Sequence, residues 1–194
     1  LRGAPTEWHD YASDLFESAM ALFALNDKRL TVVSDPVRGI EKRPSQSRAA
    51  MFLFALSIEN MLKGHLIAEN PHYISNGSLS REVSGGNHGL VALSNKIHGI
   101  LFSEDELDLF QCLESAIPSW GRYPIPKKHG DIALETIIDS AFVQRIERTF
   151  KRLGRALYMM LRDGWIGPHQ VQLRQARWSV YESEGVEPSR PADD

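Results

Sequence analysis

The segment from Trp120 to His129 is the part of the chain best equipped for chemistry. It combines two aromatic residues, three cations and a histidine on a proline-stiffened backbone: Trp120, Arg122, Tyr123, Pro124, Pro126, Lys127, Lys128 and His129. An arginine can stabilise phosphate charge while a histidine transfers a proton, so Arg122 and His129 are candidate catalytic residues for metal-independent RNA cleavage. Alternatively, Tyr123 can stack on a base while Lys127 and Lys128 hold phosphates. A third interpretation is a plain connector whose aromatic side chains are buried anchors.

A stripe of cations on the last predicted long helix is the second candidate. The chain as a whole has a net charge of −3, yet residues 122–177 hold 11 basic and 5 acidic residues. At 100° per residue, the apolar residues of this helix share one side and its cations share the other. Such a stripe can hold phosphates, or it can be an ordinary solvated face. Its six cations are Arg145, Arg148, Lys151, Arg152, Arg155 and Arg162, of which we take Arg145, Arg148, Arg152 and Arg155 as candidate binding residues.

Glu59 and Lys63 are a third candidate pair, on the most apolar predicted helix. They lie four residues apart in the order that favours an ion pair, with Asn60 beside them. Polar groups on an apolar helix need partners. The pair is therefore either a structural salt bridge in a buried network or part of a cleft wall that contributes to binding.

Several classes of site are not indicated by the sequence. The chain has seven histidines but no HExxH pattern, and its single cysteine, Cys112, allows neither a cysteine cluster nor an internal disulfide. No phosphate loop, dinucleotide loop or GxSxG nucleophile motif occurs. We therefore expect no metal and no cofactor.

Hydrophobic periodicity predicts an all-α fold, a bundle of about five helices around a central apolar helix. Helices are expected over 6–29, 45–69, 88–98, 103–117 and 132–163, and 169–180 can form one more. Residues 31–44 are expected to be a loop that can include a short extended piece, and 71–86 a polar surface loop. We expect one helical domain over 1–180 and a mobile, acidic tail over 181–194.

The apolar run from Ala49 to Ile58 is too short to span a membrane and is expected to be a buried core helix. The chain begins without methionine and without a charged-then-apolar leader. We therefore expect a soluble, cytoplasmic protein that does not contact a membrane.

Four segments, in this order, resemble the sequence pattern of HEPN domains. They are Ala49–Leu66 with its Glu59 and Leu62-Lys63, Asn87–Leu93 with its His88 and Leu90, Ser103–Leu113, and Gly121–Pro124. The resemblance implies a four- or five-helix bundle, often a homodimer, linked to RNA cleavage or nucleotide binding. Catalytic members carry an arginine and a histidine a few positions apart on a late helix. Here only Arg122 and His129 match that spacing, on a segment with two prolines.

Three hypotheses follow for the function. The first is a HEPN-like helical module that binds RNA, a nucleotide or a protein partner without robust catalysis. The second is a metal-independent endoribonuclease that uses Arg122 and His129. The third is a purely structural or regulatory homodimer.

Overall fold

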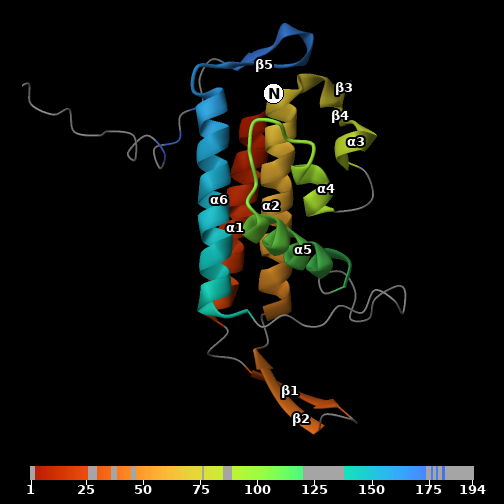
Figure 1. Cartoon of the computed structure of the whole chain (residues 1–194), viewed down its shortest axis with the longest axis vertical. Coiled ribbons are helices and arrows are strands. Elements are labelled where there is room, and N and C mark those ends of the chain that lie inside the picture. Colours follow the sequence, from red (N-terminus) through yellow and green to blue (C-terminus); the bar gives the residue numbers. More distant parts are fainter. Residues whose placement is uncertain are drawn as a thin grey trace, which may run out of the picture.

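Long helices make up most of the architecture, as the cartoon in Figure 1 shows. The computed structural model describes residues 3–25, 30–35, 39–44, 47–75, 77–84, 89–119 and 138–173, together with 176, 178 and 181. Within these residues the α-helices are α1 (Pro5–Ala24), α2 (Ser47–Glu69), α3 (Arg81–Ser84), α4 (Leu90–Ser94), α5 (Glu104–Ser119) and α6 (Ser140–Leu161). The predicted all-α class is thus confirmed at the level of a mostly helical fold.

Helix α2 is the centre of the bundle, as its apolar sequence predicts. It packs against α1, α4, α5 and α6, and its side chains from Ala50 to Ile67 supply much of the fully buried core. A Cβ on Gly64 would lie 3.2 Å from Cβ of Trp8 and 3.3 Å from Cδ2 of Leu157, so the missing side chain lets α1 and α6 approach α2 closely. Among the described residues, Arg48–Glu69 alone is long and apolar enough to cross a membrane, but 72% of its apolar window is buried in the fold.

The expectation of a loop over 31–44 is wrong. Strands β1 (Leu30–Asp35) and β2 (Gly39–Pro44) form a regular antiparallel hairpin in which Leu30 pairs with Pro44 and Asp35 with Gly39. Gly39 has a φ of +80°, a value that glycine adopts readily at a hairpin turn. In Figure 1 the hairpin extends beyond the end of the helical bundle.

The polar stretch 71–86 also contains more order than a plain loop. It includes a 3₁₀ turn η2 (Pro71–Tyr73), the two-residue strands β3 (Ile74–Ser75) and β4 (Ser78–Leu79), and α3.

The predicted helix over 88–98 is reduced to α4, whereas the helix predicted from Ser103 is confirmed as α5. Its capping box is present, because Oγ of Ser103 accepts from the Glu106 amide at 3.3 Å and a Glu106 carboxylate oxygen accepts from the Ser103 amide at 3.0 Å.

Helix α6 begins later than its periodicity predicts. Residues 132–137 lie outside the described part, and the helix starts at Ser140 because the Asp139 carboxylate caps it by accepting from the Phe142 amide at 2.7 Å. After α6, strand β5 (Trp165–Ile166) pairs with β6 (Gln172–Leu173) around the 3₁₀ turn η4 (Pro168–Gln170). The prediction of a further helix over 169–180 is therefore wrong for residues 169–173, which the structure describes.

Candidate phosphate-binding cleft

Helix α6 is amphipathic in the way that its sequence predicts. Its apolar side is buried, including Val143, Ile146, Phe150, Leu153 and Leu157. On α1, the ring of Phe16 stacks on Phe150 with their centroids 4.4 Å apart. This packing fixes the rotation of α6, and the cations on its other side therefore have defined positions.

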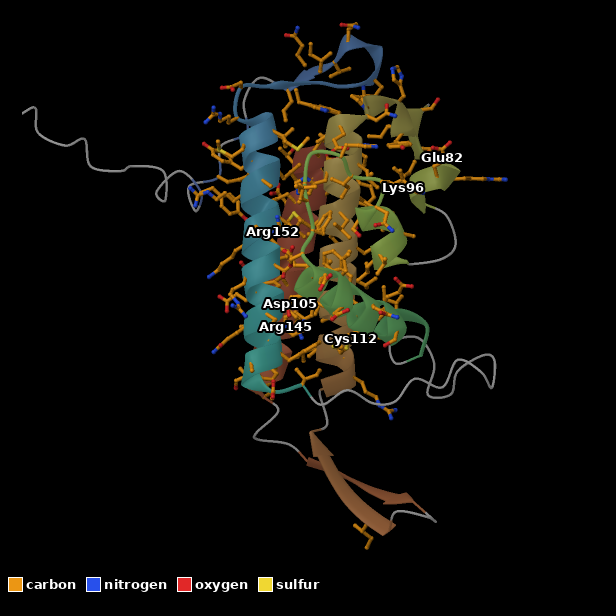
Figure 2. The ribbon with its side chains drawn as sticks, viewed as in Figure 1. Glu82, Lys96, Asp105, Cys112, Arg145 and Arg152 are labelled. Carbon is orange, nitrogen blue, oxygen red and sulfur yellow. The ribbon has the colours of Figure 1, made fainter. Side chains whose placement is uncertain are left out.

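Three arginines of α6 meet the start of α5 at a shallow cleft of about 410 Å³. The cleft is lined by Leu101, Ser103, Asp105, Glu106, Arg145, Arg148, Thr149 and Arg152. Arg145, Arg148 and Arg152 occupy positions i, i+3 and i+7 of α6, so they share one face of the helix. Figure 2 shows Asp105 at the start of α5 close to Arg145, with Arg152 farther along α6.

Arg152 is held firmly at this cleft. Its Nε donates to one carboxylate oxygen of Glu106 at 2.6 Å and its Nη2 donates to the other at 2.8 Å. Glu106 is buried and also accepts from the Ser103 hydroxyl at 3.2 Å. The guanidinium carbon lies 5.5 Å from the ring centroid of Phe102, a cation–π distance. This bidentate pair ties α5 to α6 and orients the guanidinium group.

Arg145 and Arg148 are held less tightly. Arg145 Nη2 lies 2.7 Å from an Asp105 carboxylate oxygen and donates to the Asp105 backbone oxygen at 2.9 Å, but the Asp105 side chain is 68% exposed. Arg148 is exposed, and Nε donates to the Gln144 backbone oxygen at 3.4 Å. Arg148 forms no ion pair with any residue that the structure describes, so its charge faces solvent at the cleft.

The stripe is therefore more neutralised than its sequence suggests. Lys151 pairs with Glu147 at 2.8 Å and Arg162 with Asp163 at 3.4 Å, both on or next to α6. Arg155 is exposed but does not line the cleft. Of the four predicted binding arginines, the structure brings together Arg145, Arg148 and Arg152.

Glu59 and Lys63 form the predicted ion pair, with Nζ 2.5 Å from a carboxylate oxygen. Their side chains are 4% and 14% exposed, and the Lys63 ammonium lies 5.9 Å from the ring centroid of Trp8. Neither residue lines the arginine cleft. The salt-bridge interpretation is confirmed, and a role for this pair in binding stays a prediction.

The predicted catalytic and binding residues of the proline-containing segment lie outside the described residues. They are Arg122, Tyr123, Lys127, Lys128 and His129. Their roles in cleavage or binding therefore stay predictions.

Among the described residues, two buried histidines have shifted pKa values, and neither lines the cleft. Burial lowers the pKa of His65 to about 4, although a hydrogen bond to the Leu153 backbone oxygen opposes this effect. Burial also lowers the pKa of His9, against the opposing effect of Asp10. His9 stacks on Trp178 at 4.0 Å and hydrogen-bonds the Tyr181 hydroxyl at 3.2 Å. In the described part of the chain no three His, Cys, Asp or Glu side chains are grouped to hold a metal ion.

Sequence reasoning missed the acidic side of the cleft. Asp105 and Glu106 are recognisable as the first turn of α5, and Glu106 as the partner of Ser103 in a capping box. Their second role, as partners of Arg145 and Arg152, depends on how α5 crosses α6. The only signal in the sequence was the surplus of arginines on the last helix beyond the acids near them.

Comparison of the chain with protein-family models, with curated proteins and with solved structures finds no match.

Proposed function

We propose that this protein is a HEPN-like helical module that binds RNA through its phosphates, without robust catalysis. The observation that carries the proposal is the convergence of Arg145, Arg148 and Arg152 on one cleft. Three guanidinium groups stand there against two carboxylates, those of Asp105 and Glu106. The cleft thus has a net positive charge in a chain whose total charge is negative.

The three arginines suit different parts of a phosphate contact. Arg148 has no ion pair with a described residue, so its guanidinium can donate to a ligand oxygen. Arg145 can exchange its Asp105 carboxylate for a phosphate at small cost, because an exposed ion pair contributes at most about 1 kcal/mol. Arg152 is oriented by Glu106 and stabilises the wall of the cleft. A single-stranded RNA fits this arrangement, because a positively charged groove can follow the backbone of a single strand.

The test is the affinity of a fluorescently labelled single-stranded RNA at low salt, measured by anisotropy in the presence of a chelator. Arg148→Ala should weaken binding about tenfold, as expected for the loss of a charged hydrogen bond. Lys151→Ala is the matched control, because it removes the same charge from the same helix outside the cleft. Equal loss in the two variants would mean that total charge, and not the cleft, binds the RNA.

A further inference from the structure

A second cleft, here called the upper cleft, lies along α6 beyond Arg152. It measures about 540 Å³ and is lined by Glu69, His98, Gly99, Ile100, Ala156 and Met160. Ala156 and Met160 follow Arg152 at steps of four residues, so they extend the face of α6 that carries the arginines. The segment that joins α4 to α5 lines both clefts, with Gly99 and Ile100 at this one and Leu101 and Ser103 at the other. In Figure 1 this segment runs down beside α6 before it reaches α5.

The lining of this upper cleft combines an apolar floor with a polar edge. Ile100, Ala156 and Met160 provide the floor, and Met160 is 37% exposed. At the edge, the imidazole of His98 is 91% exposed, and Nδ1 lies 3.6 Å from a carboxylate oxygen of Glu69. A nucleobase has the matching form, because its faces are apolar and its edge carries hydrogen-bonding groups.

Backbone amides hold the Glu69 carboxylate in a position where it can accept from the polar edge of a nucleobase. One carboxylate oxygen accepts from the Gly99 amide at 2.7 Å, and the His98 amide lies 3.1 and 3.0 Å from the two oxygens. Two backbone donors leave part of the accepting capacity of a carboxylate unused, since its two oxygens offer about four lone-pair sites. The side chain is still 17% exposed, so a ligand can reach it.

We infer that the upper cleft binds a nucleobase of the RNA strand whose phosphate lies on Arg145 and Arg148, and that it prefers guanine. This inference rests on the proposed function. Guanine presents two adjacent N–H donors, N1–H and the exocyclic N2–H, for the lone pairs of Glu69 that the His98 and Gly99 amides leave unused. Uracil and cytosine lack this pair. The negative charge of Glu69 also disfavours a phosphate there, which fixes the orientation of the strand along α6.

The test compares three labelled hexauridine RNAs in which one central residue is guanosine, inosine or an abasic site. The wild-type chain should bind the guanosine RNA at least about fivefold more tightly than the abasic RNA, as expected for one stacked base. It should also favour guanosine over inosine, which lacks the N2 amino group. Glu69→Gln, a substitution of equal size, should bring the guanosine and inosine affinities together.

Met160→Glu tests the floor of the cleft without touching Glu69. It should remove the preference for guanosine over the abasic RNA, whereas Met159→Glu, at an exposed neighbour that does not line the cleft, should retain it. Equal wild-type affinity for the guanosine and abasic RNAs, with Arg148→Ala still weakening both, would overturn the base site and leave the phosphate cleft standing. No binding of any RNA at low salt would overturn the proposed function and this inference with it.

Discussion

Acid should destabilise this fold through a fully buried side chain, His65. The residue is fully buried between α2 and α6. Nε2 lies 2.9 Å from the Leu153 backbone oxygen, so this nitrogen carries a hydrogen, and Nδ1 is buried without a partner in the described residues. Replacing His65 by glutamine keeps a donor for Leu153 and removes the titrating group.

The size of the effect follows from the two pKa values. Burial lowers the pKa of His65 from 6.5 to about 4 in the folded chain, so between these values the unfolded chain binds the proton and the folded chain does not. Stability from the neutral side chain is therefore complete above pH 6.5 and is lost as the pH falls toward 4. At about 1.4 kcal/mol for each pH unit, the full loss is about 3 kcal/mol.

The assay is urea denaturation followed by circular dichroism at pH 7, 5.5 and 4.5. The two proteins differ only at this position, so the difference between wild type and His65→Gln isolates the histidine. The wild type should lose more stability than the variant across this range, approaching the full 3 kcal/mol near pH 4. His98→Gln, at an exposed position, should behave as wild type. Equal acid sensitivity of wild type and His65→Gln would refute the reasoning.

Three further predictions concern packing, capping and catalysis. Gly154→Ala should destabilise the fold by about 1–3 kcal/mol in a denaturation curve, because the new Cβ would clash with the Tyr181 hydroxyl oxygen; an unchanged curve would mean that Tyr181 does not pack there. Ser103→Ala should cost about 1 kcal/mol by removing the cap of α5, and no loss in thermal denaturation would count against the capping box. If Arg122 and His129 cleave RNA, fragments should appear in chelator and vanish in His129→Ala, whereas equal cleavage by that variant would exclude the role.

The elements that sequence predicts well are those fixed by local chemistry. The apolar residues of α2 indicate a central helix, Ser103 and Glu106 indicate a helix start, and the spacing of Glu59 and Lys63 indicates their ion pair. Each of these signals depends on residues within one or two turns of each other. Apolar spacing predicts a start of α6 that is too early, because the spacing continues upstream of the Asp139 cap.

The missed features depend on contacts between distant parts of the chain. The strands of the β1–β2 hairpin show no clear alternation of apolar and polar residues, so the sequence pattern does not predict their pairing. Arg145 meets Asp105 across 40 residues of sequence, and Arg152 meets Glu106 across 46. No helical periodicity predicts which acids a cationic face will meet. The candidate cleft was therefore half predictable, in its arginines but not in its carboxylates.

The dependence of RNA affinity on salt is the most direct test of the central claim, that phosphate binds at the arginine cleft. The slope of log K against log salt counts the phosphate contacts of a single strand, at about 0.7 for each contact. If phosphate binds at this cleft, Arg148→Ala should make the slope shallower by about 0.7, while Lys151→Ala should leave it unchanged. A slope that is identical in wild type and Arg148→Ala would contradict the claim.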